Sequence, residues 1–322
     1  INKTIDTQGK AGIGKVTKSI ALYFTFLKMV RSHQPDLILI PISQTTVGFI
    51  KDAPYITIAK IFGSRVLIQL RGSNLKTWLT GASSLTRWFF KKVVNGTDGV
   101  LVLGEKLRYL FEEYFVAEKI FVAPNGGDYT FPEPDKQTDK LSVLYLANLY
   151  ESKGVRVALD AALASSGESF RFKFAGGWRD DQSFKEKFLA DVASSRADIE
   201  VKDPVSGEAK FKLFSQADIF VFPPIMPEGH PWVLVEAMAA GLPIIATDQG
   251  AITESVVHGK NGFIVAPGQP DLIVEKLKYL KDNPGERERM AKASRTLYEE
   301  GFSGEKLADN YTNIFNSVIQ QN

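Results

Sequence analysis

Residues 219–247 read IFVFPPIMPEGHPWVLVEAMAAGLPIIAT, and this stretch decides the fold. It opens with the continuously apolar run Ile219–Phe222, which is typical of a strand covered on both faces of a parallel sheet. A segment with helical spacing follows, with Pro231 suited to its first position and Gly241 to its end. The apolar run Pro243–Thr247 comes next. A strand, a helix and a strand in this order are the repeating unit of a parallel sheet.

Short apolar runs separated by helical segments continue in both directions from this stretch. The expected strands are Leu37–Ile42, Val66–Leu70, Gly99–Leu103, Lys119–Ala123, Leu141–Leu146, Phe170–Ala175, Ile199–Lys202, Ile219–Phe222, Pro243–Thr247 and Phe263–Val265. This alternation favours an α/β fold with doubly wound parallel sheets, and 322 residues have room for about two domains. Residues 129–140 are polar and contain two prolines, so we interpret them as the linker between the domains.

Composition narrows the class of protein. The formal net charge of +2 gives no sign of a nucleic-acid partner, and the absence of cysteine excludes disulfides and thiolate metal sites. The longest apolar stretch, around Ile20–Leu27, is shorter than the ~18–20 residues of a spanning helix. Ile1–Thr7 does not resemble a signal peptide. We therefore expect a soluble protein in the cytoplasm.

The segment GKAGIGKVTKS, residues 9–19, is similar to the phosphate-binding loop of nucleoside triphosphatases. In that loop a serine or threonine follows the lysine at once to bind magnesium, whereas here Val16 does. The preceding INKTIDTQ is also too polar for the buried strand that the motif requires. We expect a solvated loop that leads into a helix over Val16–Val30. A P-loop-like NTPase that uses Gly9–Lys18 is kept as an alternative.

The loop after Ile219–Phe222 is the candidate functional segment, because open parallel sheets bind ligands at the carboxyl ends of their strands. Glu228 lies in this loop and Glu236 lies in the following helix. The free backbone N–H groups around Pro231–Val233, at the start of that helix, form a natural seat for a phosphate.

The stretch PEGHPWVLVEAMAAGLPIIATDQGAITE, residues 227–254, resembles the signature of the retaining glycosyltransferases of family 4, also described as glycosyl transferases group 1. Its mark is a glutamate, seven residues and a second glutamate, here Glu228 and Glu236. Further pieces resemble family motifs in the family's order, from about Val66 to the end of the chain. They are VAPNGGD (122–128), ANLYESKG (147–154) and VVHGKNGFIV (256–265).

The resemblance implies the GT-B architecture, in which two Rossmann-like domains face a cleft. Residues 1–128 would form the acceptor domain, apparently without its first strand and glycine-rich loop. Residues 141–305 would form the donor domain, which binds a nucleotide sugar. A C-terminal helix, 306–322, is expected to follow and could join the first domain.

The resemblance also implies roles for single residues. The leaving diphosphate needs positive charge, and because the sequence has no Asp-x-Asp metal motif, a helix N-terminus and fixed cations must supply it. Lys153 would be such a cation, Glu236 would bind the ribose hydroxyls and Glu228 would lie beside the transferred sugar. The other implied donor-binding residues are Gly229, His230, Pro231, Trp232, Val233, Asn148, Gly177 and Val205.

Two positions depart from the family pattern. Asn148 stands where the family has an arginine that binds the diphosphate, and Arg71 stands where a histidine precedes glycine. We hypothesise that Arg71 is a catalytic residue that restores the missing positive charge, since a guanidinium group suits phosphate. Binding of Arg71 to backbone or to a carboxylate is the alternative.

The resemblance therefore implies a retaining, metal-independent hexosyltransferase without a cofactor. Its donor would be a nucleoside-diphosphate sugar, with UDP favoured over GDP, and its acceptor a glycan or lipid-linked glycan of a bacterial surface polysaccharide. Another GT-B enzyme, such as a nucleotide-sugar epimerase or a phosphorylase, and a non-catalytic nucleotide-sugar binder are the alternatives.

Residues 86–94, TRWFFKKVV, combine basic and aromatic side chains at helical spacing. Such a helix could rest peripherally on the inner face of the plasma membrane. A helix that faces the core and extends its lysines into solvent is the alternative.

Overall fold

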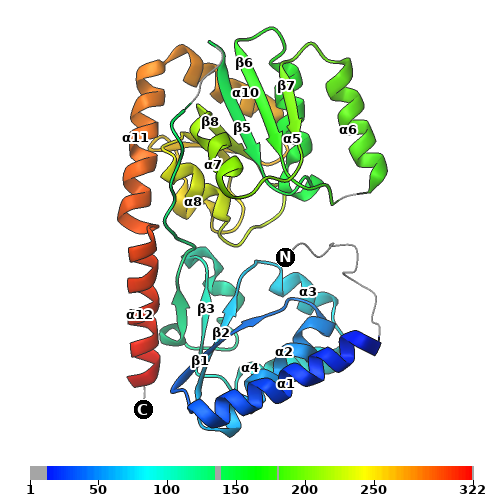
Figure 1. Ribbon diagram of the computed structural model, residues 1–322, viewed down its shortest axis with the longest axis vertical. Helices are drawn as coiled ribbons and strands as arrows, with labels where there is room; N and C mark the ends of the chain where they lie inside the picture. The colour runs from blue at the N-terminus through cyan, green and yellow to red at the C-terminus, as the bar shows by residue number, and fades with distance from the viewer. Residues whose placement is uncertain (1–12, 135–138, 180, 321–322) are drawn as a thin grey trace. The chain divides into compact units, whose positions relative to one another are not determined.

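The computed structural model describes residues 13–134, 139–179 and 181–320, which form two compact units. Each unit is built on its own sheet (Figure 1). The first unit contains the described chain up to Val102, Tyr109–Phe121 and the segment from Thr312. The second unit contains Leu103–Arg108 and Val122–Tyr311. All ten expected strands are present, with ends that differ from the expected ones by no more than one residue.

The sheet of the first unit has the order β1-β2-β3-β4, and β1, β2 and β3 are parallel. Its central strands are buried because their residues are apolar on both faces. The strands are β1 (Leu37–Ile42), β2 (Arg65–Leu70), β3 (Gly99–Val102) and β4 (Ile120–Val122). The α-helices are α1 (Ile13–His33), α2 (Thr46–Ile61), α3 (Leu75–Gly81) and α4 (Ser84–Val94), and Ala117–Lys119 forms a 3₁₀ helix. A second 3₁₀ helix, Glu105–Leu110, has residues in both units.

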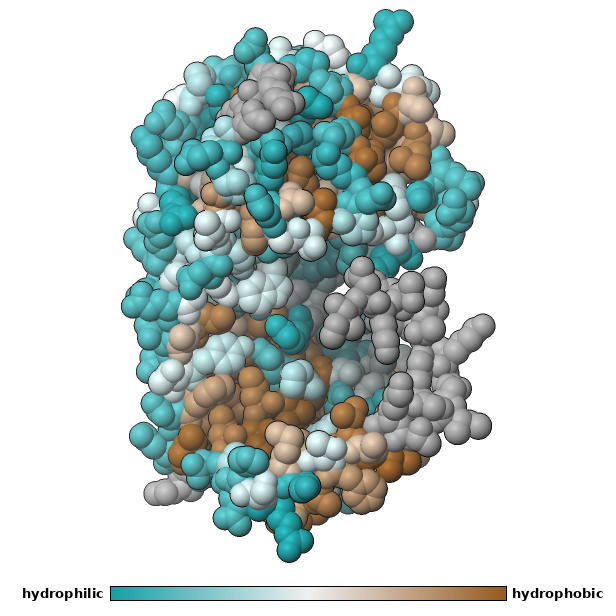
Figure 2. All heavy atoms as spheres, in the orientation of Figure 1, coloured by the Kyte–Doolittle hydropathy of each residue, from teal (hydrophilic) through white to brown (hydrophobic). Residues whose placement is uncertain are grey.

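Side-chain caps fix where the helices of the first unit begin. The hydroxyl of Thr45 accepts a hydrogen bond from the N–H of Gly48 before α2, and Ser83 does the same for Thr86 before α4. Helix α1 packs on α2, where Tyr23 and Phe26 contact the ring of Tyr55. The outer surface of α1 carries several exposed apolar side chains (Figure 2). They are Ile20, Leu22, Phe24 and Met29.

The sheet of the second unit has the order β10-β9-β8-β5-β6-β7, and every neighbouring pair is parallel. Its strands are β5 (Leu141–Leu146), β6 (Phe170–Ala175), β7 (Ile199–Lys202), β8 (Ile219–Phe222), β9 (Ile244–Thr247) and β10 (Gly262–Val265). Its α-helices are α5 (Val155–Ala164), α6 (Gln182–Ser194), α7 (Gly207–Ser215), α8 (Trp232–Ala239), α9 (Ile252–Ser255), α10 (Pro270–Asp282) and α11 (Pro284–Gly301), with a 3₁₀ turn at Glu151–Lys153.

Apolar side chains on both faces of this sheet form two core clusters, because successive residues of a strand point to opposite faces. Val143 belongs to one cluster, with residues of α5, α6 and α10. Leu144 belongs to the other, with residues of α7, α8 and α11. Helices therefore cover both faces, and the doubly wound α/β architecture is confirmed.

The starts of three helices differ from expectation. Helix α1 begins at Ile13 rather than Val16, and residues 9–12 of the phosphate-loop look-alike lie outside the described residues. Helix α8 begins at Trp232, so Pro231 is its N-cap and not its first residue. Helix α12 spans Gly304–Gln320, because the carboxylate of Asp128 accepts a hydrogen bond from the N–H of Gly304 at 2.9 Å. In the described part of the chain no helix combines the length and hydropathy that crossing a membrane requires.

Candidate active site

The two central strands of the second sheet, β5 and β8, are the point at which the chain changes the direction in which it adds strands. From β5 the sheet continues through β6 to β7, and from β8 it continues through β9 to β10. Because β5 and β8 are parallel, their carboxyl ends lie at the same edge. In an open α/β sheet the ligand crevice lies at such a reversal. Residues 147–154 follow β5 and residues 223–231 follow β8, so both segments lie at this crevice.

The segments after β5 and β8 pack directly against each other. The N–H of Ile225 donates a hydrogen bond to the carbonyl oxygen of Ser152 at 3.1 Å. Gly154 has a φ of 73°, and a Cβ at this position would lie 1.8 Å from the carbonyl oxygen of Pro223. Only glycine permits both the backbone conformation and this approach. The contact fixes the neighbouring Lys153 against the loop.

Lys153 and Glu228 form an ion pair across the crevice. The Nζ atom of Lys153 lies 2.6 Å from Oε1 and 2.7 Å from Oε2 of Glu228. The two side chains are only 27% and 14% exposed. Burial raises the pKa of Glu228, although Lys153 acts in the opposite direction. The structure thus brings together two of the three predicted catalytic residues.

The backbone around Glu228 is also held from the side of β9. Gly250 has a φ of 65°, and a Cβ there would lie 1.8 Å from the carbonyl oxygen of Glu228. The N–H of Ala251 donates to the carbonyl oxygen of Gly229 at 3.2 Å. The loop is therefore a fixed structure that presents the Glu228 side chain to Lys153.

The side chain of His230 is buried beneath the loop, and its two ring nitrogens have protein partners. Its Nδ1 accepts a hydrogen bond from the N–H of Asn125 at 3.1 Å, which leaves Nε2 to donate to the hydroxyl of Ser255. The ring stacks on Phe302 at a centroid distance of 5.3 Å. Burial lowers the pKa of His230 to about 4. The imidazole therefore stays neutral and ties the loop to neighbouring segments.

Helix α8 points its N-terminus at the same loop. Pro231 has no side-chain oxygen, and among the described residues no N-cap side chain accepts a hydrogen bond from the first turn, so the N–H groups at Trp232 and Val233 can bind a ligand. The positive end of the helix dipole adds to the attraction for an anion.

Glu236, one turn further along α8, forms an ion pair with Lys210, a residue that no sequence motif predicts. The ammonium of Lys210 on α7 contacts Oε1 of Glu236, while Oε2 is buried without a hydrogen-bond partner among the described residues. Burial raises the pKa of Glu236, and Lys210 opposes that effect. A lysine on a helix surface gives no motif signal, so only the fold could reveal this pair.

Tyr129, at the start of the predicted linker, adds a second polar atom of this kind. Its hydroxyl is buried and has no hydrogen-bond partner among the described residues. Burial, and then the charge of Glu236, raises the pKa of Tyr129. Buried polar groups are nearly always paired, so these two oxygens are exceptions among the described residues.

The other predicted donor-binding residues follow β5, β6 and β7, whose carboxyl ends form the same sheet edge. Asn148 is exposed. Its side-chain oxygen lies close to Gly177, since a Cβ added to Gly177 would be 3.8 Å from that oxygen. Val205 is half-buried and packs on the cluster that contains α7 and α8.

Arg71, the third predicted catalytic residue, belongs to the first unit. It is exposed at the carboxyl end of β2. Among the described residues, no group of three or more histidine or acidic side chains has the arrangement that a metal ion needs.

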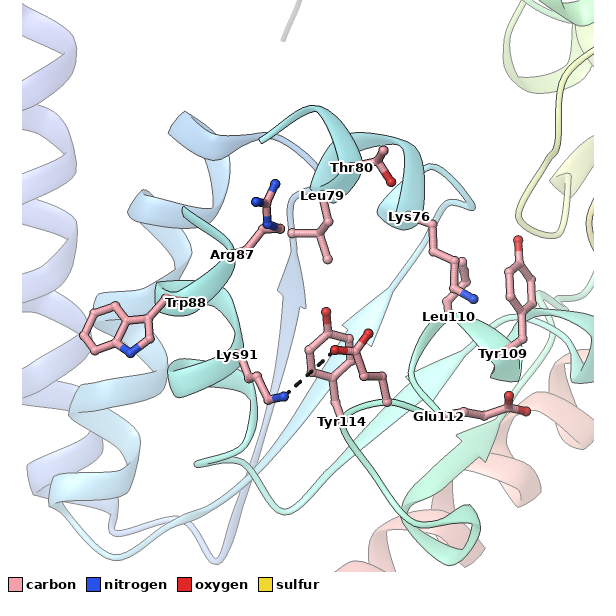
Figure 3. A pocket seen from close by; sticks show the side chains of 11 residues that line it. Lys76, Leu79, Thr80, Arg87, Trp88, Lys91, Tyr109, Leu110, Glu112 and Tyr114 are labelled. Carbon is pink, nitrogen blue, oxygen red and sulfur yellow. Dashed lines mark ion pairs between the residues drawn. The ribbon is translucent and has the colours of Figure 1, made fainter. Parts of the chain in front are cut away.

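The first unit contains a cavity of its own, with a volume of about 700 Å³ between α3, α4 and residues 109–114 (Figure 3). Lys76, Arg87 and Lys91 bring three cations to its walls. The Lys91 ammonium lies 3.9 Å from a carboxylate oxygen of Glu113, and the Lys76 ammonium lies 4.5 Å from the ring centroid of Tyr109. No motif in the sequence predicts this cavity.

Comparison with known proteins supports the same picture. The chain is 25% identical over 188 residues to the capsular polysaccharide biosynthesis glycosyltransferase CapM of Staphylococcus aureus, covering 57% of this chain and 48% of that protein. It is 28% identical over 177 residues to the putative colanic acid biosynthesis glycosyltransferase WcaL of Escherichia coli, covering 50% of this chain and 41% of that protein. The chain therefore matches less than half the length of these relatives.

Solved structures match over almost the whole chain. A glycosyltransferase from Rickettsia africae gives a TM-score of 0.79 at 15% identity, covering 100% of this chain and 85% of its own. Anabaena Alr3699/HepE in complex with UDP gives 0.76 at 17% identity, covering 92% and 82%. The fold is thus that of the GT-B glycosyltransferases. Residues 128–297, slightly more than half of the chain, match the family described as Glycosyl transferases group 1. The chain belongs to the glycosyl transferases group 1 family.

Proposed function

We propose that this protein is a retaining glycosyltransferase of family 4 that transfers a sugar from a nucleoside-diphosphate sugar to a glycan or lipid-linked glycan. The observation that carries the proposal is the contact between Lys153 and Glu228 at the strand-order reversal, next to the N-terminus of α8. This arrangement offers a cation and free N–H groups to a diphosphate. The names of the relatives, which act in capsular and colanic acid biosynthesis, support a role in bacterial surface polysaccharide synthesis.

In the proposed donor complex, Lys153 and the first turn of α8 bind the diphosphate and stabilise its charge as the sugar leaves. A helix N-terminus contributes up to ~2 kcal/mol and a hydrogen bond to a charged group ~1.5–3 kcal/mol, so both are needed. No metal ion takes part. Glu228 lies beside the transferred sugar, and the backbone of Gly229 lines its pocket. Arg71 supplies a positive charge for the diphosphate, which the family obtains from an arginine at the position of Asn148.

The nucleoside occupies the edge formed by the loops after β6, β7 and β8. Glu236 accepts hydrogen bonds from the ribose hydroxyls through its unpaired oxygen. The backbone of Val205 and Gly177 contacts the base. We assign His230 to positioning the loop, since its imidazole is enclosed by protein. The UDP complex of the structural neighbour Anabaena Alr3699/HepE supports UDP as the nucleotide of the donor.

The acceptor would bind through residues 1–128, and residues 141–305 would bind the donor. A lipid-linked acceptor would bring the enzyme to the cytoplasmic face of the plasma membrane, and we propose that it works there.

The test is to incubate the protein with UDP-glucose, UDP-N-acetylglucosamine or GDP-mannose in EDTA and a bacterial envelope extract, and to measure release of the nucleoside diphosphate. Release that depends on the extract, with a product of unchanged anomeric configuration by NMR, supports the proposal. A free epimerised nucleotide sugar identifies an epimerase, and sugar 1-phosphate formed from glycan and phosphate identifies a phosphorylase. Binding of donor without turnover identifies a non-catalytic binder, and hydrolysis of ATP that Lys15→Ala removes identifies the NTPase.

A further inference from the structure

An apolar groove of about 290 Å³ lies between α2 and α4 on the first unit. Its lining includes Ile50, Leu85 and Trp88, which are 54%, 72% and 58% exposed. The buried ring of Phe49 lies beneath them and contacts the rings of Trp78 and Phe90. A single exposed apolar residue is ordinary, but three around one groove form a contiguous apolar patch.

Cationic side chains border this patch on α4. Leu85, Trp88 and Lys92 follow one another at helical spacing and therefore share one face. The ammonium of Lys92 lies 5.2 Å from the Trp88 ring centroid. Arg87 and Lys91 lie on the neighbouring flank, where they line the larger cavity together with Trp88 (Figure 3).

The charge on α4 is of one sign, because α4 contains no acidic residue. On α2, Lys51 is exposed, and the carboxylate of Asp52 accepts a hydrogen bond from the N–H of Ser43 at 2.7 Å. The acidic groups nearest to α4 in the cavity are Glu112 and Glu113. Glu113 pairs with Lys91 at 3.9 Å, and both side chains are more than half exposed. Exposed pairs at this distance are weak, so Lys91 is available to another anion.

We infer that α2 and α4 form a docking face for an anionic lipid bilayer. Apolar side chains flanked by lysine and arginine are the pattern by which a helix lies in a membrane interface. Tryptophan prefers the headgroup level, and lysine and arginine are attracted to anionic headgroups. A surface of uniform negative charge complements this face better than a protein of mixed charge.

The docking face goes beyond residues 86–94, because it includes Ile50 on α2 and Leu85 just before that segment. The inference rests on the proposed function only in the choice of membrane, since a lipid-linked acceptor would lie in the same bilayer. The binding itself needs no donor.

The experiment is co-sedimentation of the full chain with sucrose-loaded vesicles. One set contains phosphatidylcholine and phosphatidylglycerol in equal parts, and the other contains phosphatidylcholine alone. We expect binding to the anionic set, little binding to the neutral set, and release as salt rises from about 0.1 M to about 1 M, which shortens the Debye length from about 10 Å to about 3 Å. Equal binding to both sets, or none to the anionic set, overturns the inference.

Two variants locate the contact. The double variant Lys91→Gln/Lys92→Gln should lower the partition coefficient roughly thirtyfold, since each cation near the surface contributes about fivefold. Leu85→Ser should weaken binding without unfolding the protein, because Leu85 is mostly exposed. The matched control is Lys260→Gln/Lys292→Gln, which removes the same charge from exposed positions of the second unit and should bind as the parent does. Parental binding by the α4 variants contradicts the inference.

Fluorescence gives a site-specific readout. Trp88 should enter the headgroup region, so anionic vesicles should shift the emission of the parent protein to shorter wavelength, and Trp88→Phe should remove most of that shift. A shift that persists in Trp88→Phe overturns the assignment. UDP titration of the same samples separates the two proposals. Absence of vesicle binding with measurable UDP binding contradicts only the docking face. Failure to bind UDP contradicts only the proposed donor site.

Discussion

The ammonium of Lys153 contacts both carboxylate oxygens of Glu228, at 2.6 and 2.7 Å, and so joins the loop after β5 to the loop after β8. In the proposed complex a diphosphate competes with Glu228 for this ammonium. The carboxylate thus limits how tightly the diphosphate binds, and it also holds Lys153 where the leaving group forms.

Glu228→Gln should therefore bind UDP at least as tightly as the parent protein, because it removes a negative charge that repels the diphosphate. Sugar transfer should fall by on the order of a hundredfold, the range typical of loss of one electrostatic contact to a transition state. Titration calorimetry with UDP and initial rates with UDP-glucose measure the two effects. UDP binding tenfold weaker than that of the parent would contradict this role for Glu228.

Gly154→Ala should destabilise the protein and weaken UDP binding. Gly167→Ala is the control, because Gly167 has a φ of 87° but no atom within 4 Å of a Cβ placed there. The control substitution carries only the left-handed backbone penalty, about 1–2 kcal/mol. Gly154→Ala adds a clash with the carbonyl oxygen of Pro223.

The measurements are urea unfolding and UDP affinity. We expect Gly154→Ala to lose more stability than the control, and expect only Gly154→Ala to lose UDP affinity. If the two variants behave alike, the close packing of Gly154 on Pro223 is not what positions Lys153.

His230 should make the stability of the second unit depend on pH. Its pKa is about 4 in the folded protein and about 6.5 in an unfolded chain, so the unfolded chain binds the extra proton more readily. The free energy of unfolding should therefore decrease by up to about 3 kcal/mol as pH falls from about 6.5 to about 4.

Unfolding free energies measured across this pH range should show a steeper fall for the parent than for His230→Gln, which cannot take up that proton. Parallel curves for the two proteins would show that the imidazole is not the group responsible.

Lys210 should govern how Glu236 recognises ribose. Lys210→Met removes the partner that lowers the pKa of Glu236, so that pKa should rise further, and UDP affinity should fall and should decrease more as pH is lowered than it does in the parent. Lys212→Met is the control, because Lys212 is exposed on the same helix.

A ligand series makes the test specific to ribose. The parent should bind UDP roughly tenfold more tightly than 2′-deoxy-UDP, which corresponds to ~1.4 kcal/mol, and Glu236→Gln should lose that preference. Tyr129→Phe should reduce it. An unchanged preference in Glu236→Gln would remove Glu236 from the ribose site.

The sequence was sufficient to predict the strands, because a strand buried on both faces is a continuous apolar run, as in Leu144 and its neighbours. It also placed Lys153 in the segment after the expected strand Leu141–Leu146 and Glu228 in the loop after Ile219–Phe222, but it did not show that these two strands are neighbours. It could not predict the contact between Lys153 and Glu228, which depends on the glycine at 154 lying against Pro223. Lys210 and Tyr129 were missed because a surface lysine and a linker tyrosine carry no spacing signal. His230 was placed in the loop, but its burial against Phe302 depends on a segment 72 residues away in sequence, as the residue numbers show.

Lys153, as the cation that binds the diphosphate together with α8, is the residue on which the proposed function depends most. Calorimetric titration of UDP in EDTA, with Lys153→Met compared with the parent and with Lys187→Met as an exposed-lysine control, tests this directly. We predict that the parent and the control bind UDP without metal, and that Lys153→Met binds roughly tenfold to a hundredfold more weakly, the equivalent of ~1.5–3 kcal/mol. Equal affinity in Lys153→Met, or a parent protein that binds UDP only with a divalent metal, would contradict the account.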